Sequence, residues 1–122
     1  MSGQHLPVML RQVIEALQPK AGGVYVDGTF GGGGYTKAIL DAADCTVIAI
    51  DQDPQAIERA KPLQDAYGKR LVLVQNNFAN AADIIKQQGY EGVDGIVLDL
   101  GVSSYQLDEG GRGFSFMHDG PL

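Results

Sequence analysis

Residues 24–35 read Val-Tyr-Val-Asp-Gly-Thr-Phe-Gly-Gly-Gly-Gly-Tyr, and this stretch decides the fold of the chain. The first three residues alternate and branch like the end of a buried strand, and Asp27 follows them directly. Gly28 and the four glycines at 31–34 leave the backbone without Cβ atoms, so a ligand can approach it closely. Apolar residues at helical spacing follow in residues 35–40. We therefore predict a strand, a ligand-binding loop and a helix whose first N–H groups face the same cleft.

The spacing of the glycines excludes two common phosphate-binding motifs. No three of them stand at i, i+2 and i+5, as a dinucleotide fingerprint requires, and no Gly-Lys-Ser/Thr closes a Walker loop. Instead, Asp27 precedes small residues at every second place, namely Thr29, Gly31 and Gly33. This arrangement resembles the first motif of S-adenosylmethionine (SAM) methyltransferases, with Thr29 where a first glycine is usual. A plain glycine-rich turn is the alternative interpretation.

Strand-like and helical segments alternate along the chain. Apolar runs predict strands at residues 24–26, 46–50, 71–74 and 93–100. Amphipathic spacing predicts helices at residues 8–17, 35–40 and 79–88. A further helix is predicted to start at Asp53-Pro54, with Ala56, Ile57, Ala60 and Leu63 on its buried face, and we expect Pro62 to end or bend it. Strands that alternate with helices indicate a parallel sheet with right-handed crossovers. The predicted fold class is thus α/β and Rossmann-like, a parallel sheet of about four strands with flanking helices.

Polar residues stand where each predicted strand ends. In parallel sheets ligands bind beyond the carboxyl ends of the strands, so we expect Asp27, Asp51, the Asn77-Phe78 pair and Asp99 to share one rim. Asp51 is placed to accept two hydrogen bonds from a ribose diol, with a capping role as the alternative. Phe78 could lie against an adenine ring or belong only to the core.

The predicted rim suits transfer of a methyl group. Backbone N–H groups of the glycine loop can hold the carboxylate of the methionine end of SAM, and the sulfonium is already a good leaving group, so catalysis is mainly positioning. An oxygen of Asp99 could accept a hydrogen bond from an exocyclic amino group, which makes the nitrogen lone pair more nucleophilic. A structural cap of the following turn is the alternative role for Asp99.

Composition limits the partners that this stretch can hold. Nine basic and fifteen acidic residues give a net charge of −6, and no run of Lys and Arg occurs, so phosphate contacts to a nucleic acid must come largely from elsewhere. The single cysteine, Cys45, excludes an internal disulfide, suits a reducing cytosol, and is expected to start a strand and fill core space. Neither a signal-peptide pattern nor an apolar run of membrane-spanning length is visible, which favours a cytoplasmic protein.

Several separated blocks resemble one family, the RsmH (MraW) methyltransferases. The blocks are His5-x-Pro7-Val8, Tyr25-Val26-Asp27-Gly28-Thr29-Phe30-Gly31, Ala49-Ile50-Asp51-Gln52-Asp53-Pro54, Asp94-Gly95-Ile96-Val97-Leu98-Asp99-Leu100-Gly101-Val102-Ser103-Ser104, Gln106-Leu107-Asp108, Arg112-Gly113-Phe114-Ser115-Phe116 and Asp119-Gly120-Pro121-Leu122. The resemblance implies a bacterial enzyme that uses SAM to methylate the N4 amino group of a cytidine in 16S ribosomal RNA. It therefore implies SAM as cofactor and ribosomal RNA, or the small ribosomal subunit, as partner.

The same resemblance implies roles for particular residues. Residues implied to contact SAM are Gly33, Gly34, Tyr35, Asp51, Phe78, Asp99 and Gln106, with Asp51 on the ribose and Asp99 nearest the transferred methyl group as the catalytic candidate. No metal ligand is predicted. Tyr35 stands where many relatives carry histidine, so a backbone role for this position survives better than a side-chain role. Gln12 replaces an acidic residue common in the first helix, with no evident consequence.

The family pattern extends beyond residue 122, so the chain looks like the N-terminal part of a SAM-dependent methyltransferase domain. We expect a leader helix in residues 1–20, cofactor-binding β/α units in residues 21–100 and a glycine-rich active-site loop in residues 101–122. A sheet that ends after its fourth strand would leave an unpaired apolar edge, a liability for self-association.

Two other functions stay open from the sequence. A non-catalytic module that binds SAM or another nucleoside would share the same loop and the same acid at residue 51. A nicotinamide-dependent oxidoreductase domain is disfavoured by the glycine spacing. Binding of nicotinamide cofactor but not of SAM would favour the oxidoreductase.

Overall fold

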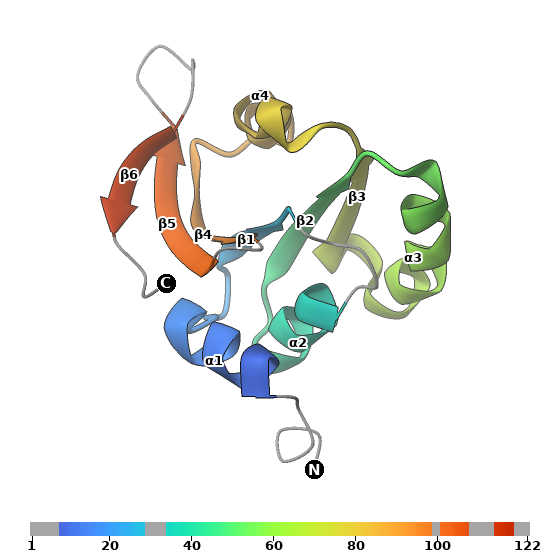
Figure 1. Cartoon of the computed structure of the whole chain (residues 1–122), viewed down its shortest axis with the longest axis horizontal. Coiled ribbons are helices and arrows are strands. Elements are labelled where there is room, and N and C mark those ends of the chain that lie inside the picture. Colours follow the sequence, from blue (N-terminus) through green and yellow to red (C-terminus); the bar gives the residue numbers. More distant parts are fainter. Residues whose placement is uncertain (1–7, 29–33, 99–100, 108–113, 119–122) are drawn as a thin grey trace.

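The computed structural model describes residues 8–28, 34–98, 101–107 and 114–118. A parallel sheet in the order β3-β2-β1-β4 forms its centre (Figure 1). Its strands are β1 (Val24–Asp27), β2 (Thr46–Asp51), β3 (Leu71–Gln75) and β4 (Gly92–Leu98). The helices are α1 (Val8–Leu17), α2 (Gly34–Ala42), α3 (Pro54–Tyr67) and α4 (Ala81–Gln87). The predicted α/β class and parallel order are confirmed.

Alternate residues of the central strands point to opposite faces of the sheet. Val26 of β1 stands beside Ile48 of β2 and Ile96 of β4, and all three are buried on one face. Tyr25, one position earlier, stands beside Val47 and is buried on the other face. Because both faces are apolar, these strands are nearly continuous hydrophobic runs, as buried parallel strands are.

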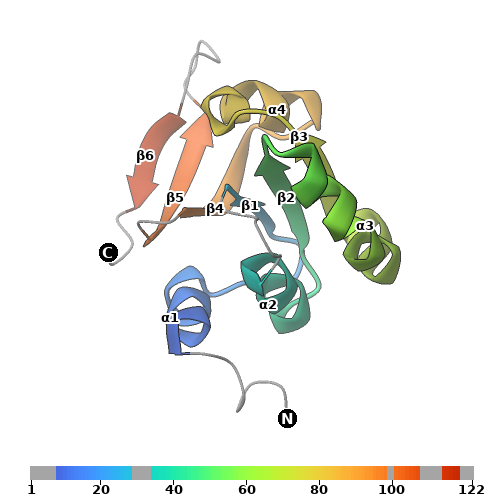
Figure 2. The same cartoon turned by 45° about the vertical axis from the view of Figure 1, so that its right-hand side comes forward.

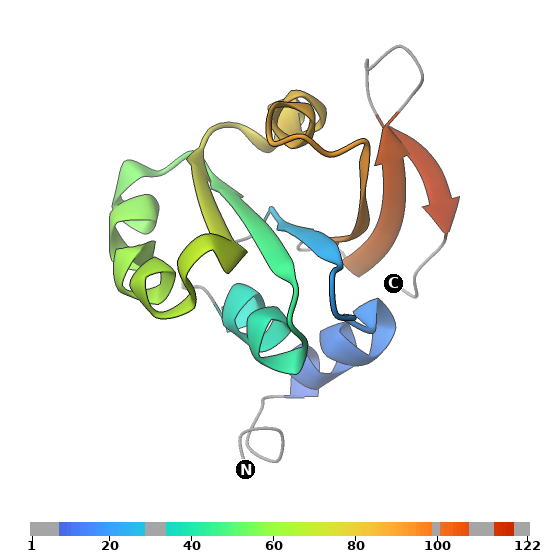
Figure 3. The ribbon, with the colours of Figure 1, turned by 180° about the vertical axis from the view of Figure 1, so that it is seen from behind.

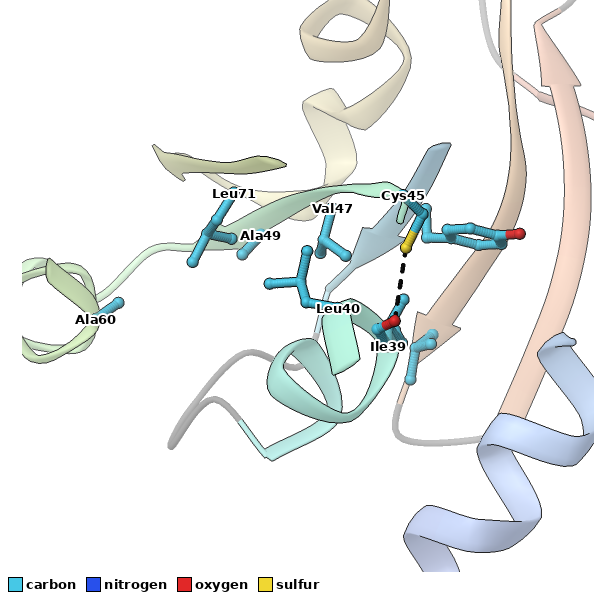
Figure 4. Packing of buried hydrophobic residues seen from close by; sticks show 9 residues of the cluster. Ile39, Leu40, Cys45, Val47, Ala49, Ala60 and Leu71 are labelled. Atoms are coloured by element: carbon cyan, nitrogen blue, oxygen red, sulfur yellow. Dashed lines mark hydrogen bonds between the residues drawn. The ribbon is translucent and has the colours of Figure 1, made fainter. Parts of the chain in front are cut away.

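Helices α1, α2 and α3 cover one face of the sheet (Figures 1 and 2). Figure 4 shows Ile39 and Leu40 of α2 and Ala60 of α3 against strand residues of this cluster. Cys45, just before β2, is 2% exposed, and its thiol donates to the carbonyl oxygen of Ile39 at 3.5 Å. The prediction that Cys45 fills core space is therefore confirmed.

The opposite face carries α4, which lies across the sheet from α1 and α2 (Figure 3). Ile84 and Ile85 of this helix are buried against strand residues that include Val26, Ile48 and Ile96. The helix predicted for residues 79–88 is divided in the structure. A 3-10 turn, η3 (Phe78–Asn80), comes first and α4 follows it.

Local sequence signals explain where α3 begins but not where it ends. Asp53 caps α3 by accepting a hydrogen bond from Gln55 N at 2.9 Å, with Pro54 as the first helical residue, as predicted. Pro62, however, does not end α3, which continues to Tyr67. Ala60, Leu63 and Tyr67 pack against the core cluster on both sides of the proline, so burial outweighs the lost backbone hydrogen bond.

Two further strands extend the sheet beyond β4. Strand β5 (Gly101–Leu107) pairs antiparallel with β4, and β6 (Phe114–His118) pairs antiparallel with β5. The prediction that residues 101–122 form a loop is therefore wrong for these two segments, which pair as antiparallel strands. Since β5 covers β4, the expected unpaired edge at the fourth strand is also wrong, and with it the basis for self-association there.

Candidate functional site

The strand order of the sheet changes direction at β1, next to the carboxyl end of this strand. The chain leaves β1 through α2 to β2 on one side, whereas β4 lies on the other side. Ligands of open α/β sheets bind where the strand order reverses in this way. The Gly28 N–H donates to the carbonyl oxygen of Val97 at 3.0 Å, which ties the start of the glycine segment to β4.

Asp51, the last residue of β2, is fixed from two sides at this rim. Its Oδ1 accepts a hydrogen bond from the Asp53 N–H at 2.9 Å, and its backbone oxygen accepts one from the Asn76 N–H at 3.0 Å. The side chain is half-buried. Carboxylate oxygens are hydrogen-bond acceptors, as binding to a diol requires.

A network of asparagines shapes the turn that follows β3. Asn76 Oδ1 accepts from the Asn77 N–H and from Asn80 Nδ2, both at 2.7 Å. Asn77 Oδ1 accepts from the Ala79 N–H at 2.9 Å, which starts the turn η3. Side-chain oxygens therefore replace backbone partners around Phe78 and fix its position in the turn.

Phe78 lies against the end of β1. A Cβ atom added to Gly28 would stand 2.6 Å from the Phe78 ring and 2.8 Å from a methyl carbon of Leu98. Glycine is therefore the residue that allows the ring to approach the backbone this closely. Phe78 is half-buried and packs against the α4 side of the core, so the ring has both a core contact and an exposed part.

Asp27 and Thr36 join the two ends of the glycine segment. The Thr36 hydroxyl donates to Asp27 Oδ2 at 2.6 Å, and both residues are 0% exposed. Asp27 ends β1, and Thr36 is the third residue of α2. The pair thus fixes the first turn of α2 relative to the central strand.

The structure brings several predicted site residues together and leaves others undescribed. Asp27, Asp51 and Phe78 lie at the same rim. Gly34 is the first residue of α2, and among the described residues no atom lies within 4 Å of where its Cβ would stand. Tyr35 is half-buried and packs against the core under α2. Gln106 is in β5, whereas Gly33 and Asp99 lie outside the described residues.

Sequence reasoning missed Thr36, Asn76 and Asn80 as members of the site. The signal for Thr36 was a hydroxyl in the first turn of a helix that follows an acidic strand end. The asparagines formed a visible polar cluster around Phe78, and such residues are typical of side-chain-capped turns.

An open hollow of about 680 Å³ lies elsewhere, beside β3 and the end of α3. Its lining includes Gln64, Lys69 and Leu71, at the amino end of β3, so it does not coincide with the rim described above. Among the described residues, no helix has the length and apolar character that crossing a membrane requires.

Comparison with solved structures places this fold in one class. The C-terminal domain of precorrin-6Y C5,15-methyltransferase from Rhodobacter capsulatus has a TM-score of 0.61 at 21% identity, over 75% of this chain and 47% of that one. A SAM-dependent methyltransferase from Thiobacillus denitrificans, solved with S-adenosyl-L-homocysteine, has a TM-score of 0.53 at 21% identity, over 62% of this chain and 31% of that one. The protein therefore has the Rossmann-like fold of SAM-dependent methyltransferases.

Sequence comparison then gives the family. The MraW methylase family matches residues 2–122. A protein from Parvibaculum lavamentivorans named ribosomal RNA small subunit methyltransferase H is 55% identical over 118 residues, which is 97% of this chain and 35% of the relative. The chain belongs to the MraW methylase family and spans about a third of the length of the curated relatives it matches.

Proposed function

We propose that this protein transfers the methyl group of SAM to the N4 amino group of a cytidine in 16S ribosomal RNA. The observation that carries the proposal is the joint placement of Asp51 and Phe78 at the rim, with the Asn76 N–H bound to the Asp51 backbone oxygen at 3.0 Å. An acid and an aromatic ring at these two strand ends are what a bound adenosine needs. Membership of the MraW methylase family supports the same reaction.

The residues of the rim fit the parts of SAM. Asp51 would accept hydrogen bonds from the ribose diol, and the exposed part of Phe78 would contact the adenine ring. The backbone of Gly33, Gly34 and Tyr35, at the start of α2, would hold the methionine carboxylate, because first-turn N–H groups and the helix dipole favour an anion there. Asp99 and Gln106 complete the proposed cofactor set.

Methyl transfer requires the protein mainly to align the methyl group of SAM with the cytosine amino group. SAM supplies a methyl group on a sulfonium, and the N–C bond forms as the S–C bond breaks, with the amino proton passing to solvent. Asp99 follows β4 and would accept a hydrogen bond from the cytosine amino group, which localises the nitrogen lone pair. The net charge of −6 implies that residues outside this stretch make most phosphate contacts. Ribosomal RNA as substrate implies a cytoplasmic protein.

Calorimetric titration of the full-length protein with SAM and S-adenosylhomocysteine tests the cofactor site. The substitution Asp51→Asn keeps an oxygen for the Asp53 N–H but removes the charge, so we expect SAM affinity to fall about thirtyfold. Asp53→Asn is the matched control: it makes the same chemical change two residues away and keeps the cap of α3, so affinity should stay within about twofold.

Two outcomes would contradict the proposal. Binding of NADH in place of SAM would favour an oxidoreductase domain. SAM binding without methylation of small ribosomal subunits by the full-length protein would favour a non-catalytic binding module.

A further inference from the structure

Asn76 is bonded to the strand end that carries Asp51 and to both sides of Phe78. Its backbone N–H donates to the backbone oxygen of Asp51 at 3.0 Å. Its side-chain Oδ1 accepts from the Asn77 N–H, just before Phe78, and from Asn80 Nδ2, two residues after Phe78, both at 2.7 Å. One residue therefore connects the end of β2 with the turn that carries the Phe78 ring.

The rest of the turn is built from side-chain amides in the same way. All three asparagines of the chain, at 76, 77 and 80, lie in it. Asn77 Oδ1 accepts from the Ala79 N–H at 2.9 Å, and the Asn80 N–H donates to the Asn77 backbone oxygen at 2.9 Å. Asn77, Ala79 and Asn80 are exposed, so water can replace their partners. The network therefore fixes the shape of the turn more than it stabilises the core.

The shape of this turn sets where the Phe78 ring lies. A Cβ at Gly28 would stand 2.6 Å from the ring and 2.8 Å from a methyl carbon of Leu98, so the ring lies close against the end of β1. Core packing holds one part of the half-buried Phe78 side chain. The backbone from which the ring starts is held by the Asn76 side chain, which bonds on both sides of it.

We infer that Asn76 is a positioning residue for the adenine of SAM, which sets the place of Phe78 relative to Asp51. This inference rests on the proposed function, because Phe78 and Asp51 are the proposed contacts of adenine and ribose. A ring whose position is set before binding loses less conformational entropy when adenine contacts it. The Asn76 side chain therefore contributes to affinity through Phe78, without touching the methionine end of the ligand.

Three variants of the full-length protein test this role. Asn76→Leu keeps the size of the side chain and removes the acceptor, Asn76→Asp keeps the acceptor, and Gln75→Leu removes an amide from the exposed residue before it. We expect the Kd for S-adenosylhomocysteine to rise about tenfold in Asn76→Leu, and to stay within about threefold in Asn76→Asp and about twofold in Gln75→Leu. The kcat at saturating SAM should change less than about twofold in Asn76→Leu.

Two further titrations identify the route through Phe78. In a Phe78→Leu protein, adding Asn76→Leu should change the Kd by less than about twofold, because the ring through which the amide acts is gone. 5′-Methylthioadenosine lacks the amino-acid end of S-adenosylhomocysteine. Its affinity should fall by the same factor in Asn76→Leu, since the change affects only the adenosine part of the ligand.

Nuclear magnetic resonance without ligand gives a readout that does not depend on binding. One Hα of Gly28 points at the Phe78 ring, because it lies in the direction in which a Cβ would stand. The ring current of Phe78 therefore shifts this resonance, which can be followed with ¹³C-labelled glycine and identified by its loss in Gly28→Ala. Asn76→Leu should move the resonance toward its ordinary position, and Asn76→Asp should restore it.

Four results would overturn the inference. They are an Asn76→Leu protein that binds S-adenosylhomocysteine as the wild type does, a tenfold loss that persists in the Phe78→Leu background, an unchanged Gly28 resonance, and an Asn76→Leu protein that does not fold while Asn76→Asp does. A wild type that binds no S-adenosylhomocysteine would instead refute the proposed function itself, so the two failures are distinguishable.

Discussion

The two ends of the parallel strands are held by different kinds of contact. At the amino end, Arg70 donates to the carbonyl oxygens of Leu40 and Ala43, both at 2.6 Å, and to that of Cys45 at 3.0 Å. These partners stand 25 to 30 positions away along the chain. At the carboxyl end, Asp27, Asp51 and Asn76 accept side-chain hydrogen bonds from residues between one and nine positions away.

From this difference we expect the amino end to contribute mainly to stability and the carboxyl end mainly to the proposed ligand binding. One guanidinium satisfies three carbonyls around the end of α2, a place where a helix leaves acceptors without internal partners. Short-range contacts at the other end shape individual turns and leave glycines and half-buried side chains facing the rim. Substitutions at the amino end should therefore change the free energy of unfolding, whereas those at the carboxyl end should change affinity.

The largest effect is expected for Arg70→Met. The variant keeps most of the side-chain bulk and loses the three hydrogen bonds to carbonyls, so the free energy of unfolding should fall by about 3 kcal/mol in urea denaturation. Lys69→Met is the matched control, because the exposed Lys69 precedes Arg70 directly, and it should change stability by less than about 0.5 kcal/mol. A fall in SAM affinity of the folded Arg70→Met protein would contradict the expectation that the amino end affects stability and not ligand binding.

A smaller effect is expected for a glycine-to-alanine substitution at either end of the parallel strands, at Gly28 of the carboxyl end or at Gly22 of the amino end. Gly28→Ala places a methyl group against the Phe78 ring, so the ring must shift and SAM affinity should fall about fivefold. Gly22→Ala meets no atom within 4 Å but has a φ of 79°, so it should lower stability by about 1 kcal/mol and leave affinity unchanged. Calorimetry and urea denaturation of both variants measure this contrast, and equal effects on affinity would contradict it.

The smallest effect concerns the pH dependence of a surface contact between α2 and α3. Asp41 accepts hydrogen bonds from Lys37 at 2.7 Å and from the Tyr67 hydroxyl. Burial raises the pKa of Asp41, but these hydrogen bonds and the nearby positive charges outweigh it, so the pKa lies below the ordinary value of 3.8. A lowered pKa means that the contact stabilises the protein above pH 3.8 and that this contribution is lost as pH falls through the folded-state pKa.

Asp41→Asn tests this pH dependence. The variant should be less stable than the wild type at pH 7 by under about 1 kcal/mol, because the side chain is 38% exposed and solvent screens the pair. The difference should shrink and disappear as pH falls from 3.8 through the lowered folded-state pKa of Asp41. Urea denaturation across this range measures it, and a difference that stays constant with pH would show that the carboxylate charge is not the cause.

Much of the fold could be predicted because its signals are local. Apolar runs that end in Asp27 and Asp51, the Asp53-Pro54 helix start, and the amphipathic pattern of α1 each depend on neighbouring residues. The predictions failed where a distant partner decides the outcome. Residues 101–122 look like a loop because of the glycines at 101, 110, 111, 113 and 120, yet residues 101–107 pair with β4 and residues 114–118 pair with residues 101–107. Of the two outcomes expected for Pro62, an end of the helix does not occur, because Ala60 and Tyr67 pack against the core on both sides of it and α3 continues to Tyr67.

The candidate site likewise has residues that local sequence signals predict and contacts that only the packed structure reveals. Asp51 and Phe78 could be chosen from the sequence because strand ends in parallel sheets share one edge, and the structure places both there. The sequence did not reveal that the Phe78 ring lies against Gly28, or that Thr36 reaches Asp27, because these contacts need the packed arrangement of strand and helix. The roles predicted for all the site residues stay predictions, namely those of Gly33, Gly34, Tyr35, Asp51, Phe78, Asp99 and Gln106.

By itself, the sequence determined the α/β class, the alternation of helices with the strands of a parallel sheet, and the polar residues at the strand ends. Periodicity, capping residues and glycine spacing are properties of short segments, so they can be read without coordinates. Only the tertiary structure decided which side chains meet: Arg70 with the end of α2, Phe78 with Gly28, and Thr36 with Asp27. Such contacts depend on how elements distant in the chain pack together, and packing follows from the shape of the whole core rather than from any one segment.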